Sequence, residues 1–448
     1  MPKKKTALTI EERLQQALVP AEEQPYEVPE NWVWVRLGAI AEIVTGGTPS
    51  KKHPEYYGGN FPFYKPSDLD QGRLTYDASE YLSEEGKNVS RIIPKNSTAV
   101  CCIGSIGKCG YLMCEGTTNQ QINSAIPKIN SLCLYYYLCT ENFVQDLLSM
   151  ASATTIAIVN KSKMESCAFP LPPLSEQQRI VERIEELLAK LDEAKERLQE
   201  VADSFAVRKA AILHKAFTGE LTKQWRRENG VRDESWEESN FGKFTVSQYG
   251  YTEKAHWEKV GPKFLRITDI QDNKVDWDEV PWCPIDEAGM KQYAVQIGDI
   301  MIARTGATTG KSYLICDDVE AVFASFLIRL KVVDKNLDYN YLYGYMQSED
   351  YWRQITDFSS GIAQPGVNAN KLKQIKFKCP SLPEQHEIVR LIDDLLARER
   401  AAQQAAEQAL ASIDLMKKSI LARAFRGELG TNKASEASAL ELLRQVLS

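Results

Sequence analysis

Residues 174–221 read LSEQQRIVERIEELLAKLDEAKERLQEVADSFAVRKAAILHKAFTGEL, and residues 382–429 read LPEQHEIVRLIDDLLARERAAQQAAEQALASIDLMKKSILARAFRGEL. A constant offset (174 to 382) aligns the two stretches without a gap, and about 20 of about 50 positions are then identical, which marks an internal repeat. The repeated stretch follows each of two other regions of the chain. The chain is therefore expected to be built from two similar halves.

Both copies carry the apolar period of a long amphipathic helix, with alternating steps of four and three residues as in the a/d seam of a heptad repeat. The seam of the first copy consists of Ile180, Ile184, Leu187, Leu191, Ala194, Leu198, Val201, Phe205 and Ile212. The seam of the second copy consists of Ile388, Ile392, Leu395, Ala402, Ala406, Ala409, Ile413, Met416 and Ile420. About 40 helical residues at about 1.5 Å each would span roughly 60 Å.

The other faces of the two helices are charged, so each narrow seam is expected to need a partner. Heptads commonly mediate dimerisation, and this alternative is open on the helices alone. A duplication with a whole domain between the copies favours an intramolecular pair instead. We therefore expect the two helices to form an antiparallel coiled coil that holds two similar domains apart.

Length and composition are those of an ordinary globular protein. The chain has 448 residues, of which 43% are hydrophobic and 26% charged, and this length predicts about three domains. It contains no run of about 18 apolar residues, so no membrane span is expected. The N-terminal lysines are followed by no apolar core, so no signal peptide is expected.

The ten cysteines form no C-x-x-C pair, and with four histidines in the chain a zinc site is not expected. We interpret the cysteines as reduced thiols of a cytoplasmic protein. The formal net charge of −7 is unusual for a nucleic-acid binder. Much of the acid lies on the long helices, however, so a basic face elsewhere remains compatible with it.

The fold class is expected to be α+β: two similar mixed α/β domains separated by two long helices. The chain divides into an N-terminal extension (1–29), a first domain (30–170), a first long helix (171–222), a connector (223–240), a second domain (241–378), a second long helix (379–430) and a tail with a short amphipathic helix (431–448).

Local patterns predict individual elements within this division. Strands are expected over 32–35, 99–103 and 110–113, and helices over 10–18, 132–150 and 440–447. The second domain resembles a diverged copy of the first. Residues 63–69 correspond to 264–270, 104–108 to 306–311, and the Asn160 and Lys163 pair to Asn368 and Lys371. Similarity is weak elsewhere inside the domains, which suggests two related but distinct ligands.

The segment Gly306-Ala-Thr-Thr-Gly310-Lys311 resembles a phosphate-binding loop, but it has three residues between the glycines where that motif has four. A strand-like run follows it, where a nucleotide site needs a helix N-terminus. A hairpin turn that brings Arg304, Thr308 and Lys311 close to a polyanion is the interpretation we favour. His53, His214, His256 and His386 complete no catalytic triad, so the chain is not expected to carry out covalent chemistry.

Recognition of DNA is the remaining interpretation, because glycines, hydroxyls, cations, aromatics and amides gather in several loops. The alternative for each loop is a solvated surface turn. The candidate DNA-contacting residues of the first domain are Thr45, Lys51, Lys52, Tyr56, Lys65, Ser67, Ser105, Lys108, Gln120 and Asn123. Those of the second domain are Gln248, Tyr249, Arg266, Thr268, Arg304, Thr308 and Lys311.

Each long helix opens and closes on a signature. The first opens with Pro170-Leu171-Pro172-Pro173-Leu174-Ser175-Glu176-Gln177 and closes with Ala216-Phe217-Thr218-Gly219-Glu220-Leu221. The second opens with Pro380-Ser381-Leu382-Pro383-Glu384-Gln385 and closes with Ala424-Phe425-Arg426-Gly427-Glu428-Leu429. Two variable domains with these repeated signatures resemble the specificity subunits of type I restriction–modification enzymes over nearly the whole chain.

The resemblance implies that each domain is a target recognition domain that reads one half of a bipartite double-stranded DNA sequence, with the helices setting the gap. It implies no catalytic residue, cofactor or metal on this chain. Two modification subunits that bind S-adenosylmethionine and methylate adenine would be partners, together with restriction subunits that use ATP and magnesium.

Two other function classes stay open at this point. The first is a scaffold whose coiled coil presents two protein-binding domains, and steeply salt-dependent DNA binding would separate it from a DNA reader. The second is a nucleotide hydrolase, which predicts nucleotide binding that is lost in Lys311→Ala.

Overall fold

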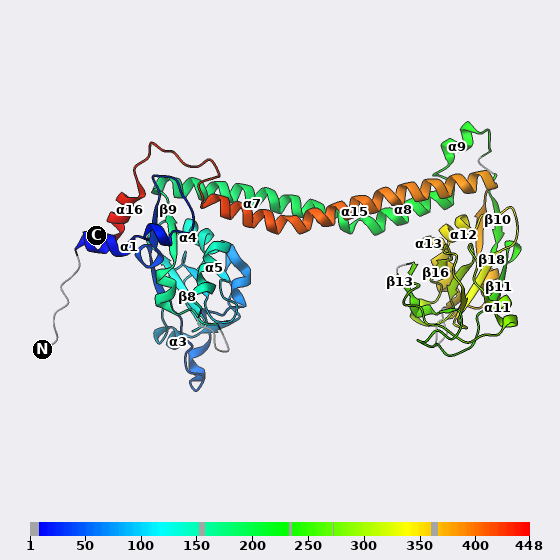
Figure 1. Cartoon of the computed structure of the whole chain (residues 1–448), viewed down its shortest axis with the longest axis horizontal. Helices are drawn as coiled ribbons and strands as arrows, with labels where there is room; N and C mark the ends of the chain where they lie inside the picture. The colour runs from blue at the N-terminus through cyan, green and yellow to red at the C-terminus, as the bar shows by residue number, and fades with distance from the viewer. Residues whose placement is uncertain (1–8, 152–156, 233–234, 272, 360–365) are drawn as a thin grey trace. The chain divides into compact units, whose positions relative to one another are not determined.

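The structure is a computed structural model that describes residues 9–151, 157–232, 235–271, 273–359 and 366–448. Residue contacts divide the chain into two compact units (Figure 1). Unit 1 comprises residues 1–198 and 408–448, and unit 2 comprises residues 199–407. Both boundaries fall inside long helices, so each unit holds one domain and part of both helices.

Unit 1 is built on an antiparallel four-stranded sheet with the order β2-β8-β5-β6. Its strands are β2 (Ala41–Thr45), β8 (Ile122–Pro127), β5 (Thr98–Cys101) and β6 (Cys109–Tyr111). Two smaller sheets accompany it: β1 (Val33–Arg36) with β9 (Ala168–Leu171), and β3 (Tyr57–Tyr64) between β4 (Glu80–Leu82) and β7 (Thr117–Thr118). The short helices are α1 (Ile10–Ala17), α2 (Leu37–Ile40), α3 (Glu84–Asn88), α4 (Ser131–Leu138), α5 (Glu141–Met150), α6 (Lys161–Ser166) and α16 (Ala439–Leu447).

Unit 2 repeats this plan with the antiparallel sheet β11-β18-β15-β16. Its strands are β11 (Thr245–Tyr249), β18 (Leu327–Val332), β15 (Ile300–Ala303) and β16 (Ser312–Leu314). The smaller sheets are β10 (Glu237–Asn240) with β19 (Lys376–Cys379), β12 (Lys263–Leu265) with β17 (Ala321–Phe323), and β13 (Ile270–Gln271) with β14 (Lys274–Val275). The short helices are α9 (Lys223–Glu228), α10 (Phe241–Phe244), α11 (Glu287–Tyr293), α12 (Tyr339–Tyr345), α13 (Glu349–Ser359) and α14 (Ala369–Lys373).

Matching turns confirm the correspondence between the two domains that the sequence suggests. Asp68 accepts a hydrogen bond from the backbone N–H of Lys65 at 2.7 Å, and Asp269 accepts one from Arg266 at 2.8 Å. Asn160 and Asn368 cap the N-termini of α6 and α14 in the same way. Short polar side chains favour such positions because they satisfy backbone donors that the helix leaves unpaired.

The long helices are α7 (Leu174–Asp203), α8 (Phe205–Thr218) and α15 (Leu382–Ala424). The first repeat copy, expected as one helix, is thus interrupted at Ser204. The backbone at Ser204 remains right-handed helical, and its N–H still donates to the carbonyl of Glu200 at 3.0 Å. The interruption therefore does not end the rod.

In each unit, the segments of the two repeat copies run antiparallel. In unit 1, Glu176 contacts Thr431, and Asp192 pairs with Lys417 at 2.5 Å. The residue number thus rises along the first copy while that of its contact in the second copy falls. In unit 2, Arg208 pairs with Glu399 at 2.5 Å, and Arg226, further along, pairs with Glu384. These ion pairs flank the apolar seam, and the aliphatic parts of their long side chains can cover it.

Burial supports the seam near the domains. Ile180, Ile184, Ile388, Ile392 and Ile413 are buried, whereas Leu187, Leu191, Leu198, Leu395 and Ile420 are half-buried.

Three seam positions of the sequence prediction are wrong. Val201 and Met416 are 39% and 50% exposed, and Ala402 is also exposed. The predicted position Ala406 is buried in α15, and so is Leu396, which the sequence prediction did not include. A step of four from Ile392 leads to Leu396 rather than Leu395, which turns a different stripe of the helix inwards.

The first and last helices, α1 and α16, both belong to unit 1, where the blue and red parts of the ribbon lie together (Figure 1). The expected helix at 10–18 is α1, and the expected tail helix is α16, which packs on α1 and α2. Leu443 of α16 is fully buried in the same core as Leu14 of α1. The tail helix thus docks on its own chain.

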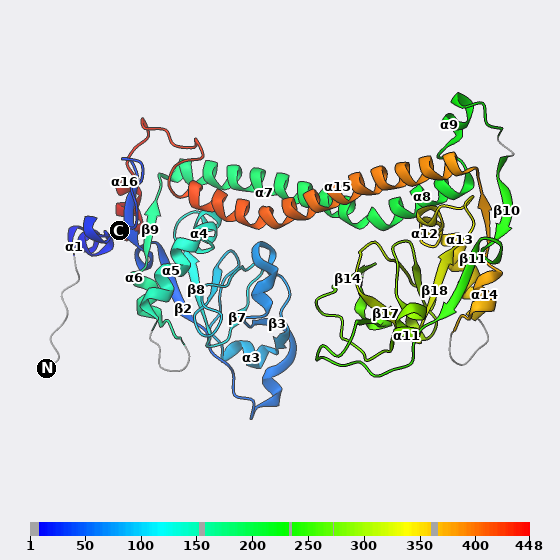
Figure 2. The same ribbon diagram turned by 45° about the vertical axis from the view of Figure 1, so that its right-hand side comes forward.

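Two further element predictions need correction. The helix expected over 132–150 is two helices, because the Thr140 hydroxyl caps α5 by accepting from the N–H of Phe143. The connector 223–240 also contains structure: it holds α9, and β10 pairs with β19 along its whole length (Figure 2). The second domain therefore begins before residue 241.

All ten cysteines are free of disulfides. Among the described helices, none combines the length and apolar character needed to cross a membrane.

Candidate nucleic-acid interface

The glycine-rich segment of unit 2 is the turn of an antiparallel hairpin between β15 and β16. Gly306 and Gly310 have φ angles of +79° and +86°, which other residues rarely adopt. Ser312–Leu314 directly after the turn is a strand. This confirms the expected hairpin: a strand, and not an α-helix whose N-terminus could face nucleotide phosphates, follows the turn.

Cationic and aromatic groups meet beside this hairpin. The guanidinium of Arg304 lies over the ring of Tyr249, 5.0 Å from its centroid, and donates to the carbonyl of Ser325. The Tyr249 hydroxyl accepts from the N–H of Ala369 at 3.2 Å. Lys311 is exposed and Thr308 is half-buried. The structure thus places Tyr249, Arg304, Thr308 and Lys311 around one strand end and one turn.

Three other candidates of unit 2 are engaged in interactions within the unit. Gln248 donates to the carbonyl of Gln292 at 3.1 Å and accepts from Arg329. Arg266 forms an ion pair with Asp269 at 2.6 Å. Thr268 is exposed on the same turn, and its hydroxyl donates to Asp269 Oδ1 at 3.5 Å. Phosphate binding by Arg266 would therefore compete with the Asp269 carboxylate.

The loop after β2 is the most exposed candidate region of unit 1. Lys51 and Lys52 are exposed, and Tyr56 stacks on His53 with ring centroids 5.0 Å apart. Tyr57 ties the loop down, because its hydroxyl donates to the carbonyl of Pro49 at 2.5 Å. The two lysines are thus free to point outwards on an anchored loop.

The other basic candidates of unit 1 are paired. Lys65 forms an ion pair with Glu80 at 3.0 Å, and Lys108 forms one with Asp70 at 2.6 Å. Ser67 and Ser105 are exposed in the turns beside them. Since the Asp70 side chain is 73% exposed, a phosphate can reach the Lys108 ammonium at little cost.

The prediction that Asn123 contacts DNA is wrong for this fold. The Asn123 side chain is 2% exposed, accepts from the Thr45 hydroxyl at 2.8 Å and donates to the carbonyl of Val159. Thr45 is half-buried by the same contact. Gln120 is exposed, but it accepts from the Thr48 hydroxyl across the loop. Asn123, buried on β8, and Gln120 both bind hydroxyls of the segment after β2, Thr45 and Thr48. These two amides therefore hold that loop in place.

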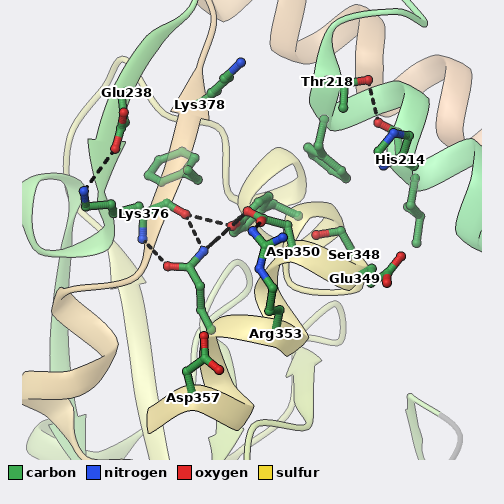
Figure 3. Close-up of a pocket in the computed structure, with 15 residues that line it drawn as sticks. His214, Thr218, Glu238, Ser348, Glu349, Asp350, Arg353, Asp357, Lys376 and Lys378 are labelled. Carbon is green, nitrogen blue, oxygen red and sulfur yellow. Dashed lines mark hydrogen bonds and ion pairs between the residues drawn. The ribbon is translucent and has the colours of Figure 1, made fainter.

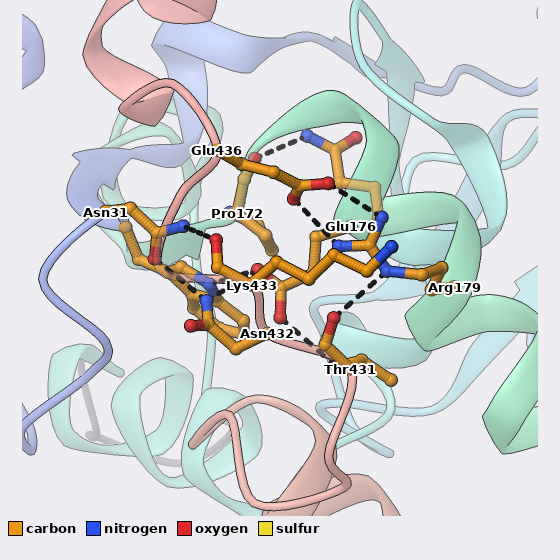
Figure 4. A network of polar contacts seen from close by, with 10 residues as sticks. Asn31, Pro172, Glu176, Arg179, Thr431, Asn432, Lys433 and Glu436 are labelled. Atoms are coloured by element: carbon orange, nitrogen blue, oxygen red, sulfur yellow. Dashed lines mark hydrogen bonds and ion pairs between the residues drawn. The ribbon is translucent and has the colours of Figure 1, made fainter.

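Sequence reasoning missed the function of the glutamate–glutamine pair that opens each long helix. In unit 1, Glu176 is fully buried and accepts from Trp32 Nε1 at 2.7 Å, from the Thr431 hydroxyl at 3.2 Å and from Asn432 Nδ2 at 2.9 Å (Figure 4). Arg179, one turn later, forms a bidentate pair with Glu436. This network joins the start of the chain, the first long helix and the tail.

Unit 2 contains a matching buried glutamate at the start of its long helix. Glu384 is fully buried and accepts from Trp236 Nε1 at 3.0 Å, from the Thr222 hydroxyl at 2.7 Å and from Arg226 at 2.7 Å. Gln177 and Gln385 donate to the carbonyls of Pro172 and Pro380. The signal in the sequence was the E-Q dipeptide at matching positions, since buried glutamates are rare unless they are paired.

The described ranges contain no group of three or more His, Cys, Asp or Glu side chains that could hold a metal ion.

Comparison with known proteins identifies the duplication. The family model described as "Type I restriction modification DNA specificity domain" matches twice, at residues 29–203 and 235–409. The chain belongs to this family. Each matched copy comprises one domain and most of the helix after it.

Two curated specificity subunits are similar to this chain over most of their length. The chain is 27% identical over 430 residues to the type I restriction enzyme EcoBI specificity subunit of Escherichia coli, covering 90% of this chain and 87% of that protein. It is 24% identical over 420 residues to the EcoKI specificity subunit of Escherichia coli strain K12, covering 90% of each. The HsdS subunit from Thermoanaerobacter tengcongensis has the same fold, with a TM-score of 0.67 over 91% of this chain and 99% of that chain at 19% identity. The chain is thus a type I specificity subunit with two DNA recognition domains.

Proposed function

We propose that this specificity subunit reads a bipartite double-stranded DNA target, one half-site per unit, and that α7, α8 and α15 form an intramolecular antiparallel coiled coil that sets the gap. The observation that carries the proposal is the matched anchoring of two differently lined domains. Glu176 and Glu384 each tie the domain to its helix by accepting from a tryptophan indole, Trp32 and Trp236. The candidate loops, in contrast, present different side chains.

The helix contacts within each unit support the coiled coil. The Asp192–Lys417 pair in unit 1 and the Arg208–Glu399 pair in unit 2 both join the two repeat copies in antiparallel direction. α7 continues from unit 1 into unit 2, and α15 continues in the opposite sense. Two readers on one face of B-DNA need a spacing near one helical turn, about 34 Å, and a rod of fixed length supplies such a spacing.

Catalysis is assigned to other polypeptides. Two modification subunits carry S-adenosylmethionine and methylate adenine in each half-site, and restriction subunits supply ATP- and magnesium-dependent cleavage. This chain contributes sequence recognition without a catalytic residue or cofactor of its own, and acts in the cytoplasm. Its phosphate contacts position the domains, and a few base-edge contacts specify the sequence.

The test exchanges one recognition domain. Residues 32–168 are replaced by the same region of a relative with a different target, and methylated adenines are mapped in host DNA by long-read sequencing. One half-site is expected to change, while the other half-site and the gap stay the same. A change in both half-sites would overturn the assignment of one half-site to each unit.

A further inference from the structure

Unit 2 contains a cavity of about 740 Å³ bounded by α8, α13, β10 and β19 (Figure 3). Its carboxylates are Glu238, Glu349, Asp350 and Asp357, and its cations are Arg353, Lys376 and Lys378. Phe217 and Tyr345 contribute aromatic rings to the lining. The four carboxylates outnumber the three Lys and Arg cations, with His214 as a further lining residue, which disfavours a nucleic acid as the occupant.

The floor of this cavity is duplicated in unit 1. Tyr345 donates to the carbonyl of Lys376 at 2.7 Å, and Tyr137, at the matching position, donates to the carbonyl of Ala168 at 2.8 Å. The ring of Tyr345 lies 5.5 Å from Phe217, and the ring of Tyr137 lies 5.2 Å from Phe425. The two sites can therefore be compared residue by residue.

In unit 1, residues 18–29 of the N-terminal extension fill this place. The ring of Tyr26 packs edge-on against Trp34 at 4.9 Å, and the guanidinium of Arg426 lies 5.3 Å from its centroid. Trp34 Nε1 donates to the carbonyl of Tyr26 at 3.1 Å. Burial raises the pKa of the Tyr26 hydroxyl well above its ordinary value. Tyr26 is thus an inserted aromatic anchor.

The same extension also covers the edge of the adjoining small sheet. The N–H of Val19 donates to the carbonyl of Trp34 at 3.0 Å, and Leu18 forms an antiparallel bridge with Val35 of β1. One segment therefore bonds to a strand edge at Leu18 and Val19, passes through a 3-10 turn at Ala21–Glu23 and then inserts the Tyr26 ring. Addition of a segment to a strand edge is a recurring mode of peptide recognition.

No described segment of unit 2 does the same. Among the described residues, β10 pairs with β19 alone. Trp34 is replaced by Glu238, Arg426 by Thr218 and Ala168 by Lys376, so the side chains that hold Tyr26 are missing. Within the described ranges, no segment covers the edge of β10 or the cavity beside it, and we name this site the unit 2 socket.

We propose that the unit 2 socket binds a segment of the partner modification subunit, which adds to the edge of β10 and inserts an aromatic side chain beside Tyr345. The identity of the partner rests on the proposed function. The acidic excess of the lining selects a segment with basic residues next to the aromatic anchor. Unit 1 does not need this segment, because the chain supplies its own.

The test uses the full-length chain and fluorescein-labelled 12-residue peptides. The native peptide has the sequence of residues 18–29, LVPAEEQPYEVP, and the basic peptide is LVPAKKQPYKVP. The basic peptide is expected to bind with a Kd of about 10–100 μM by fluorescence anisotropy, and the native peptide at least about tenfold more weakly. Replacing its tyrosine by alanine should also weaken binding about tenfold or more.

Variants on one helix locate the site. Arg353→Trp places a large ring in the cavity and should abolish binding, whereas Thr356→Trp, exposed on the same helix outside the lining, should not. The double variant T218R/E238W restores the side chains that hold Tyr26 and should reverse the preference in favour of the native peptide. Absence of binding by every peptide at about 1 mM, or equal binding by R353W, would overturn the socket.

The partner assignment has its own readout. R353W should weaken association with the purified modification subunit, measured by analytical ultracentrifugation, and T356W should leave it unchanged. Peptide binding without this effect would overturn the modification subunit as the source of the segment. Absence of DNA binding by the wild-type complex would instead contradict the proposed function, whatever the peptide result.

Discussion

Glu176 and Glu384 hold the same position in the two units: each is fully buried, and each accepts a hydrogen bond from a tryptophan indole, Trp32 at 2.7 Å and Trp236 at 3.0 Å. Around Glu176 the other donors come from the C-terminal tail, and around Glu384 they come from the connector after α8. The tail therefore occupies in unit 1 the place that the connector occupies in unit 2. In unit 1, residues near both ends of the chain, Trp32 and the tail residues Thr431 and Asn432, thus meet at Glu176.

Glu384→Ala is expected to destabilise unit 2 by about 3–5 kcal/mol, because it leaves the buried Arg226 guanidinium without its carboxylate. Hydrogen exchange followed by mass spectrometry should show faster exchange in 199–407 and unchanged exchange in the domain of unit 1. Glu193→Ala is the control, because the Glu193–Arg197 pair is exposed and contributes below about 1 kcal/mol. A uniform effect on both units would contradict the separate anchors.

Leu443→Ala is expected to destabilise unit 1 by about 2–5 kcal/mol, since a fully buried leucine is removed from the core shared by α16 and α1. The measurement is the urea midpoint of unit 1, followed by hydrogen exchange of the α1 and α2 peptides. Leu415→Ala, at a side chain that is 68% exposed, serves as the matched control and should change little. Equal effects of the two variants would show that the tail is not part of the core.

Lys311→Ala is expected to weaken DNA binding and to lower the slope of log K against log salt concentration by about 0.9, the value for one lost phosphate contact. The exposed Lys51 should behave in the same way for the other half-site. Lys195→Ala, on the exposed face of α7, is the control. An unchanged slope in Lys311→Ala would remove this residue from the phosphate contacts.

Arg304→Ala is expected to cost more than Lys311→Ala, because Arg304 stacks on Tyr249 and is held in one orientation. A side chain that reads a base edge contributes about 1–3 kcal/mol of discrimination. Binding to a panel of single-base variants should therefore show relaxed specificity at one position of one half-site. A uniform loss across the panel would assign Arg304 to the phosphate backbone instead.

Paired insertions of seven residues, one after Ala194 and one after Leu415, are expected to lengthen the gap between unchanged half-sites. Seven residues keep the heptad register and add about 10 Å, or about three base pairs at about 3.4 Å each. The positions face each other because Asp192 pairs with Lys417. Mapping of methylated adenines gives the readout, and an unchanged gap would contradict the coiled coil as the spacer.

The sequence by itself determined the duplication, the long helices, the two domains and the family. These depend on local periodicity and on motifs that recur at a constant offset, both of which are visible without coordinates. The hairpin character of Gly306–Lys311 was also predicted, because a strand-like run follows it. The terminal helices α1 and α16 were readable from their amphipathic patterns for the same reason.

Tertiary structure alone decided which polar side chains remain available. Asn123 and Gln248 have the composition of base readers, yet their partners Thr45 and Arg329 are far away in sequence and engage them inside the fold. The seam of α15 follows Leu396 rather than Leu395, because packing against the domain selects the buried stripe. The contrast between the filled socket at Tyr26 and the open socket at Tyr345 likewise depends on which distant segment covers each small sheet. Contacts between residues far apart in sequence carry no local pattern, so only the folded chain reveals them.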